Sequence, residues 1–82
     1  MKNEILQESI ESVRYSVAHS NMLWLAVNSY ILKVLASGKP IAEMVKILRD
    51  TAGPERNNEP VSISNFRNAA DQLECGEKVV LL

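Results

Sequence analysis

Hydrophobic residues recur in alternating steps of four and three over the first 34 positions of the chain. This seam comprises Leu6, Ile10, Val13, Val17, Ser20, Trp24, Val27, Ile31 and Val34. Eight of the nine positions are apolar, and no Gly or Pro precedes Gly38. Such spacing is typical of the a and d positions of a long helix that packs along another helix. We therefore predict an all-α fold that begins with one helix over residues 3–37.

A helix of that length would be longer than the compact domain that the chain can form. About 33 helical residues span roughly 50 Å, whereas a compact domain of 82 residues is about 30 Å across. Because one chain cannot cover such a helix, the seam indicates self-association or another partner, and of these we favour a homodimer. The predicted dimer interface consists of the apolar seam positions Leu6, Ile10, Val13, Val17, Trp24, Val27, Ile31 and Val34.

Two features bear on whether this long helix is continuous and on what surrounds it. Either Ser20 or Asn21 could cap a second helix that starts at Met22. The seam keeps its phase across these two residues, so we favour one continuous helix. The stretch Met22–Val27 is apolar on every face, which indicates neighbours on more than one side.

Two shorter helices are predicted in the rest of the chain. Gly38 suits a left-handed cap and Pro40 a first helical position, followed by an amphipathic segment that ends at Gly53-Pro54. After an extended loop, Ser62 or Ser64 is expected to cap a third helix that stops at Gly76. Its inward residues are expected to be Ile63, Phe66, Ala69, Ala70 and Leu73.

The chain is thus read as a single domain, residues 1–82, in three parts. Residues 1–37 form the long oligomerisation helix, residues 38–76 a helix-turn-helix-like unit, and residues 77–82 a short apolar tail. The tail is expected to be either a short strand or a peptide docked on the helices.

Composition narrows the class of protein. Hydrophobic residues make up 46% and charged residues 23%, which is ordinary for a globular domain. The formal net charge of −1 excludes a polybasic arm and weakens any case for tight, autonomous nucleic-acid binding. The single thiol, Cys75, and the absence of an apolar signal core after Met1 predict a cytoplasmic protein. The most hydrophobic stretch, Met22–Ala36, is shorter than the roughly 20 residues of a membrane span.

The segment from Ile31 to Leu73 has the order of a trihelical DNA-reading unit. The sequence of Ile31–Leu48 within it resembles the helix-turn-helix segments of small regulators encoded on plasmids and other mobile elements. In that resemblance, Ala42–Val45 looks like the supporting helix and Val61–Arg67 like the entry to the recognition helix. This sequence has the nine-residue loop 53–61 where the family usually has a turn of three or four residues.

The outward face of the third helix suits base recognition, so our leading hypothesis is a small dimeric DNA-binding transcription regulator that reads DNA with the Ser62–Glu74 helix. Arg bridges guanine, and Asn or Gln bridges adenine, in the major groove. The residues expected to read bases are Asn65, Arg67, Asn68 and Gln72, with Ser64 exposed on the same face. Lys39, Arg56 and Ser62 are expected to contact the DNA backbone, with Ser62 and the free N–H groups at the helix start holding a phosphate.

The alternative hypothesis is a non-enzymatic protein-interaction module, an adaptor, chaperone or inhibitor, that binds through the N-terminal seam. The neutral charge balance favours it. An enzyme is the least supported class, because a nucleophile, a general base and oxyanion donors cannot be assembled from these residues. His19 and Cys75 lack the partners of a zinc site, so no metal and no cofactor are predicted.

Overall fold

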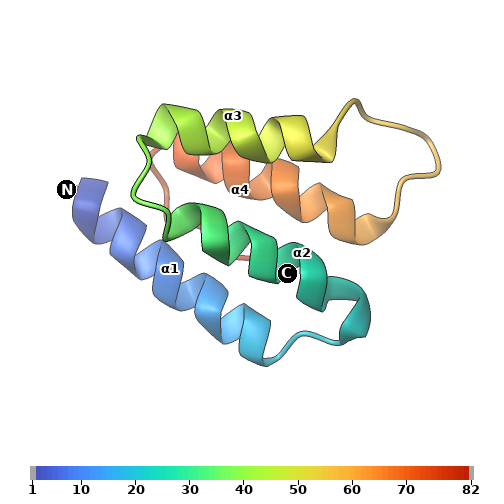
Figure 1. The fold of residues 1–82 in the computed structure, drawn as a ribbon, viewed down its shortest axis with the longest axis horizontal. Coiled ribbons are helices and arrows are strands. Elements are labelled where there is room, and N and C mark those ends of the chain that lie inside the picture. Colours follow the sequence, from blue (N-terminus) through green and yellow to red (C-terminus); the bar gives the residue numbers. More distant parts are fainter. Residues whose placement is uncertain (1, 82) are drawn as a thin grey trace.

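Four α-helices and one short 3₁₀ helix make up the fold of residues 2–81. The computed structural model describes residues 2–81, with side chains from Glu4 to Leu81; Met1 and Leu82, including the last position of the predicted tail, lie outside this range. Its elements are α1 (Lys2–Ala18), α2 (Met22–Leu35), α3 (Ile41–Ala52), η1 (Val61–Ile63) and α4 (Ser64–Glu74). Helices α1 and α2 form one antiparallel hairpin, and α3 and α4 form a second one that packs on the first (Figure 1). Residues 2–81 contain no strand, which confirms the all-α class.

The predicted single helix over residues 3–37 is wrong, because the chain turns at Ser20-Asn21. The Ser20 hydroxyl donates to the Ser16 carbonyl at 2.6 Å and closes the end of α1. Asn21 has an extended backbone (φ −79°, ψ 177°), and its Oδ1 accepts from the backbone N–H groups of Leu23 and Trp24 at 3.0 and 3.2 Å. These bonds satisfy the free donors at the start of a helix. The local capping signal therefore prevails over the continuous hydrophobic phase.

The turn also changes the role of the seam. Val13 and Ile31 are fully buried, Val27 and Val34 are nearly so, and all four belong to the core of one chain. The remaining seam residues are partly buried, namely Leu6, Ile10, Val17 and Trp24. Folding back turns both halves of the seam toward the interior of one chain. The argument for a dimer through the seam was that one chain cannot cover so long a helix, and this argument no longer applies. The radius of gyration is 11.8 Å, as expected for a compact domain of this length.

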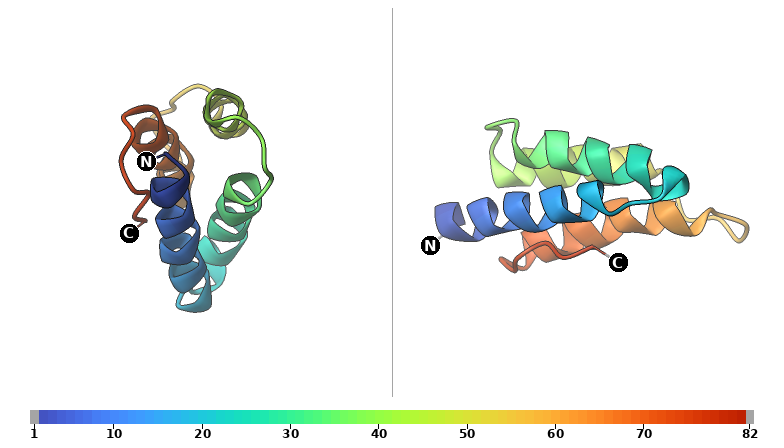
Figure 2. Two further views of the ribbon diagram at one scale, coloured as in Figure 1. Left: turned by 90° about the vertical axis from the view of Figure 1, so that its left-hand side faces the viewer. Right: turned by 90° about the horizontal axis from the view of Figure 1, so that it is seen from below.

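Helices α3 and α4 pack closely and run in opposite directions (Figures 1 and 2). Gly38, with φ +79°, lets the chain leave α2, and Pro40 precedes the first residue of α3. Gly53, with φ +70°, ends α3, and a loop of residues 53–60 leads back to η1. In a helix-turn-helix the two helices cross steeply, at about 90–120°. The side-by-side hairpin seen here does not confirm that arrangement.

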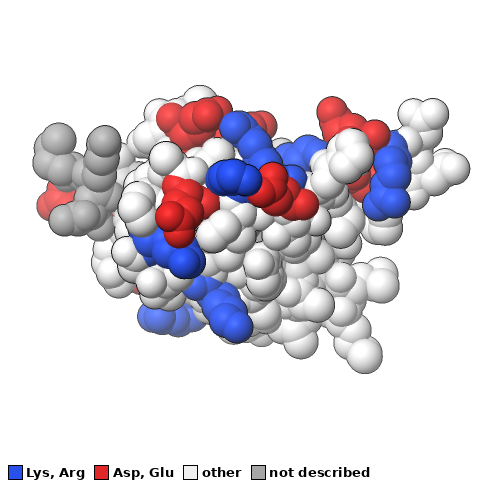
Figure 3. Space-filling view, turned by 45° about the horizontal axis from the view of Figure 1, so that its top comes forward, with Lys and Arg blue, Asp and Glu red and all other residues white. Residues whose placement is uncertain are grey.

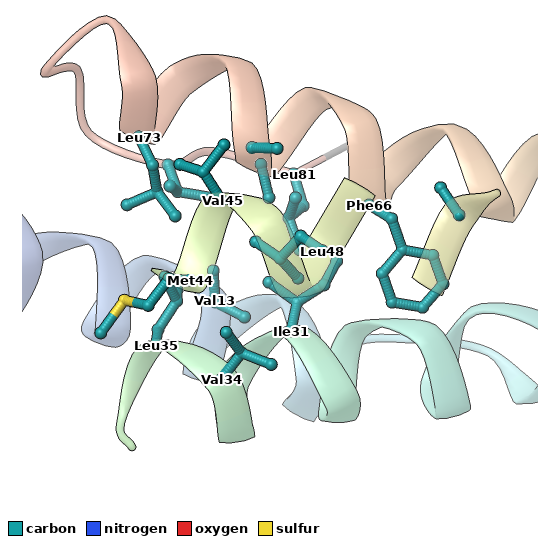
Figure 4. Close-up of a cluster of buried hydrophobic side chains, with 14 of the residues drawn as sticks. Val13, Ile31, Val34, Leu35, Met44, Val45, Leu48, Phe66, Leu73 and Leu81 are labelled. Atoms are coloured by element: carbon teal, nitrogen blue, oxygen red, sulfur yellow. The ribbon is translucent and has the colours of Figure 1, made fainter. Parts of the chain in front are cut away.

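The core lies between the two hairpins and draws side chains from every α-helix and the tail (Figure 4). Ile31 and Leu35 come from α2, Met44 and Leu48 from α3, and each is at most 1% exposed. Their positions follow the amphipathic spacing of each helix. The inward residues predicted for α4 are buried as expected, apart from Ile63, which lies in η1 and is half-buried.

The described part of the tail, residues 77–81, docks on the helices and forms no strand. Val79 and Leu81 are buried, and the Val79 N–H donates to the Ser9 hydroxyl of α1 at 2.8 Å. The Gln72 side chain of α4 bonds both backbone groups of Val80, accepting from its N–H at 2.9 Å and donating to its carbonyl at 3.3 Å. The tail thus connects α1 to α4, as the end-on view in Figure 2 also shows.

Candidate interaction surface

The four side chains that we predicted to read bases lie in different surroundings along α4. Asn65 is 1% exposed and donates from Nδ2 to the Asn28 Oδ1 of α2 at 3.0 Å, so the prediction that it faces outward is wrong. It lies on the side of α4 that meets α2, and Asn28 in turn donates to the Ser20 hydroxyl at 2.8 Å. Gln72 binds the tail through Val80. Asn68 is the exposed member of the four.

Arg67 connects the loop of residues 53–60 to α4. Its guanidinium donates to both carboxylate oxygens of Glu59 and to the Gly53 carbonyl, the latter at 2.9 Å. The Arg67 and Glu59 side chains are only 20% and 12% exposed. The hydrogen bond from Arg67 holds the pKa of the Glu59 carboxyl below its ordinary value, and the same bond raises the pKa of Arg67. Base reading would require Arg67 to leave these partners.

The predicted serine cap of the third helix is absent at the start of α4. Ser62 lies in η1, and the residue before α4 is Ile63, which makes no side-chain cap bond. The Ser64 hydroxyl donates backward to the Val61 carbonyl at 2.6 Å. Because η1 runs directly into α4, the start of this helix differs from the serine-capped end that we expected to hold a phosphate.

Basic residues on the α3–α4 hairpin have acidic neighbours (Figure 3). Arg49 lies 2.8 Å from carboxylate oxygens of both Asp71 and Glu74, and Lys46 lies 2.7 Å from Asp50. Hydrogen bonds to Glu74 and Asp71 raise the pKa of Arg49, and the bond from Arg49 lowers the pKa of Glu74. Positive and negative charges therefore alternate across α3 and α4 and do not form a one-sign patch.

The two basic residues predicted, with Ser62, to hold the DNA backbone lie far apart in the sequence and in different settings. Lys39, in the turn before α3, lies 3.3 Å from Glu43. Arg56 is exposed in the loop of residues 53–60, at the other end of α3. The structure thus does not gather the predicted DNA contacts into one surface.

A different surface, the outward face of α2, is the most distinctive part of the molecule. We define it by its exposed residues Met22, Leu23, Leu25, Ala26 and Tyr30. Met22 is 92% exposed and Leu23 79% exposed. Clusters of large apolar side chains with this degree of exposure are unusual on soluble monomeric proteins, and such clusters mark interaction sites.

No charged side chain lies in this part of the sequence. The 18 residues from Tyr15 to Leu32 contain no Lys, Arg, Asp or Glu. Figure 3 shows the corresponding contrast, with charged atoms over the top and the left of the view and a broad uncharged area at its lower right. The sequence carried this signal, because Met22–Val27 is apolar on every face. This pattern predicted neighbours on more than one side of α2, while the predicted interface named only the seam residues Trp24 and Val27 of this stretch.

A hollow of about 430 Å³ lies beside the N-terminal half of α2. It lies at the corner between α1 and α2, where Tyr15 and His19 contribute rings whose centres are 4.2 Å apart. Trp24 and Asn28 line its α2 side. Among the described residues, its lining contains no Lys, Arg, Asp or Glu.

A second hollow, of about 370 Å³, lies at the opposite end of the hairpins. Its apolar lining comes from three helices, with Ile5 and Leu6 of α1, Val45 of α3 and Leu73 of α4. Glu74 and Glu77 contribute the acidic part of its wall. Leu6 is therefore the seam residue that borders a surface hollow at this end.

Comparison with known proteins leaves the geometry as the guide to function. None of the α-helices in residues 2–81 has the length and apolar character needed to cross a membrane. No protein-family model matches the chain, and no curated protein or solved structure proves similar to it.

Proposed function

We propose that this chain is a non-enzymatic protein-interaction module that binds through the outward face of α2. The observation that carries the proposal is the exposure of Met22 and Leu23 within an 18-residue stretch without charge. Exposed apolar patches on small domains mark sites of association with other proteins. The site differs from the one that we expected from the sequence, because the apolar seam residues are buried or partly buried within one chain.

The energetics favour such a role. Full burial of a Leu or Met side chain contributes about 1.5–3 kcal/mol, and Met22, Leu23 and Leu25 are presented together on one helix. Tyr30 and Tyr15 add the aromatic side chains that are enriched at protein interfaces. The inward residues Ile31 and Leu35 hold α2 in the core, so its outward face is presented on a rigid element.

Photo-crosslinking in cells that express the chain tests this proposal. A photoreactive phenylalanine analogue replaces Met22 in one variant and Asn68, which is exposed on α4, in the control variant. We expect crosslinked protein from the Met22 position and little from the Asn68 position. The crosslinked protein is then purified, and its affinity for the chain is expected to fall at least about tenfold with Leu23→Glu, since a charge is buried unpaired.

Two results would contradict the proposal. One is equal crosslinking from the Met22 and Asn68 positions, which indicates random collision. The other is an affinity for the purified partner that Leu23→Glu leaves unchanged. Circular dichroism of each variant establishes that the helical fold is retained.

DNA reading by α4, our leading hypothesis from the sequence, is the less supported candidate. Asn65 is buried, and Arg67 is engaged by Glu59 and Gly53. Exposed Asn68 and the basic residues Lys39 and Arg56 are what favour it. Binding of mixed-sequence duplex DNA at low and high salt separates the two candidates, because phosphate contacts weaken steeply as salt rises. We expect no salt-dependent binding.

A further inference from the structure

We propose that the outward face of α2 pairs with the same face of a second copy of this chain, with the two helices antiparallel across a twofold axis. This inference rests on the proposed function and names its partner. It also replaces the predicted dimer through the seam by a dimer that uses the opposite side of the same helix.

The shape of the outward face of α2 suits close packing against a second helix. Ala26 and Ser29, three residues apart, lie on the same side of α2, and their small side chains leave a shallow centre. The larger side chains of Met22, Leu25 and Tyr30 surround this centre. A small centre with a large rim allows two such helices to approach and interdigitate.

An antiparallel register matches these residues with one another. With the twofold axis between residues 27 and 28, Ala26 of one copy lies at the level of Ser29 of the other, close to the centre of the contact, and Leu25 lies at the level of Tyr30. Met22 then faces the aliphatic stem of Lys33, whose charged end can remain in water. The same patch thus supplies both halves of the contact, as a twofold interface requires.

Charge decides between the antiparallel and parallel arrangements. Lys33 is the charged residue on the outward side of α2. In a parallel pair, the two Lys33 side chains would lie next to each other and repel. In the antiparallel register, a rise of 1.5 Å per residue separates them by about 16 Å along the helices, which is beyond the screening length of about 8 Å in physiological salt.

The exposed area is close to that of a stable dimer. If a fully exposed large side chain presents roughly 200 Å², the exposed fractions of Met22, Leu23, Leu25 and Tyr30 correspond to roughly 500 Å². Val61 of η1, which contacts α2, and Tyr15 of α1 are 71% and 68% exposed and add roughly 280 Å² where the second copy also covers them. A standard interface buries about 800 Å² per partner. Few charges need to be desolvated when this area is buried, which lowers the cost of pairing.

Sedimentation equilibrium over a range of protein concentration tests the pairing. We expect the wild-type mass to rise toward twice 9.1 kDa. Ala26→Glu places a carboxylate near the twofold axis on each copy and is expected to raise the dimer dissociation constant on the order of 100-fold or more. Ala42→Glu, the same substitution at an exposed position of α3, is the matched control and should dimerise like the wild type.

Cysteine crosslinking tests the orientation, in a Cys75→Ser background that removes the native thiol. Ala26→Cys lies near the axis and is expected to form an intermolecular disulfide under oxidation. Lys33→Cys is expected to form none, because Cα atoms more than about 7 Å apart cannot be bridged. A disulfide at Lys33→Cys would overturn the antiparallel arrangement.

Other outcomes separate this inference from the proposed function. A wild type that stays monomeric at every concentration overturns self-pairing, as does a dimer that Ala26→Glu leaves intact. If the Met22 position nevertheless crosslinks to another protein, and Leu23→Glu weakens that binding, the interaction module stands with a different partner. If neither a second copy nor another protein is crosslinked there, both proposals fail.

Discussion

The two hairpins of this protein have opposite surfaces although they share one core. On the α3–α4 hairpin, Arg49 and Lys46 have acidic partners on the outside of amphipathic helices. On the α1–α2 hairpin, the outer side of α2 presents Met22 and Leu23 to solvent. A face of paired charges is well solvated by water, whereas an apolar face is stabilised only when another surface covers it. The difference indicates which side of the molecule is made for association.

The inner and outer faces of α2 offer the largest test of this contrast. Ile31→Ala is expected to destabilise the fold by about 2–5 kcal/mol, because Ile31 is fully buried and its truncation leaves a cavity. Leu23→Ala on the outer face is expected to change stability by less than about 0.5 kcal/mol. Urea unfolding followed by circular dichroism, at low protein concentration, measures both. Similar losses for the two variants would show that the outer face already contributes to the fold of a single chain.

The link between the hairpins gives the next largest effect. Asn65→Ala removes the donor to Asn28 and leaves a buried amide without its partner, which is expected to cost about 1–3 kcal/mol. Asn68→Ala, three residues along the same helix but exposed, serves as the matched control with an expected change within about 0.5 kcal/mol. Equal urea midpoints for the two variants would contradict the structural role of Asn65.

The turn within the α1–α2 hairpin is expected to give a smaller effect. Asn21→Ala removes the side-chain oxygen that accepts from Leu23 and Trp24, at a cost of about 1 kcal/mol. Asn21→Ser retains a capping oxygen and should recover most of the loss. Thermal and urea unfolding measure both variants. If Asn21→Ala is as stable as the wild type, the turn is held by the packing of the hairpin and not by its cap.

Acid should act on the α3–α4 side, with the smallest effect. The folded-state pKa of Glu59 is lowered from its ordinary value of 4.5, so this carboxylate stabilises the fold above that pH. The contribution is lost as pH falls through the lowered pKa. The urea midpoint is therefore expected to drop below pH 4.5, with a shallower drop in Glu59→Gln and in Arg67→Gln. Profiles for both variants that run parallel to the wild type below pH 4.5 would contradict this assignment.

Local signals in the sequence identified most helix ends. The turn at Gly38–Pro40 and the end of α3 at Gly53 were predicted from residue type, because positive φ and a missing N–H are properties of single residues. The cap at Asn21 was equally legible. It was given less weight than the hydrophobic phase, which continues across the turn because both halves of the seam face the same core.

The candidate site was less predictable, because its residues are defined by partners distant in sequence. Asn65 is buried by Asn28, 37 positions away, and Arg67 is engaged by a loop carbonyl 14 positions away. Helical spacing assigned both to an outward face. Outward and inward have meaning only once the neighbouring helix is in place.

The sequence by itself determined that the chain is helical, which positions are apolar, and that residues 15–32 carry no charge. Only the tertiary structure decided which of those apolar positions are covered. Helix formation depends on residues within a turn or two, so it can be inferred locally. Burial depends on which elements meet, and folding back at Ser20-Asn21 covered the seam and left the other side of α2 exposed.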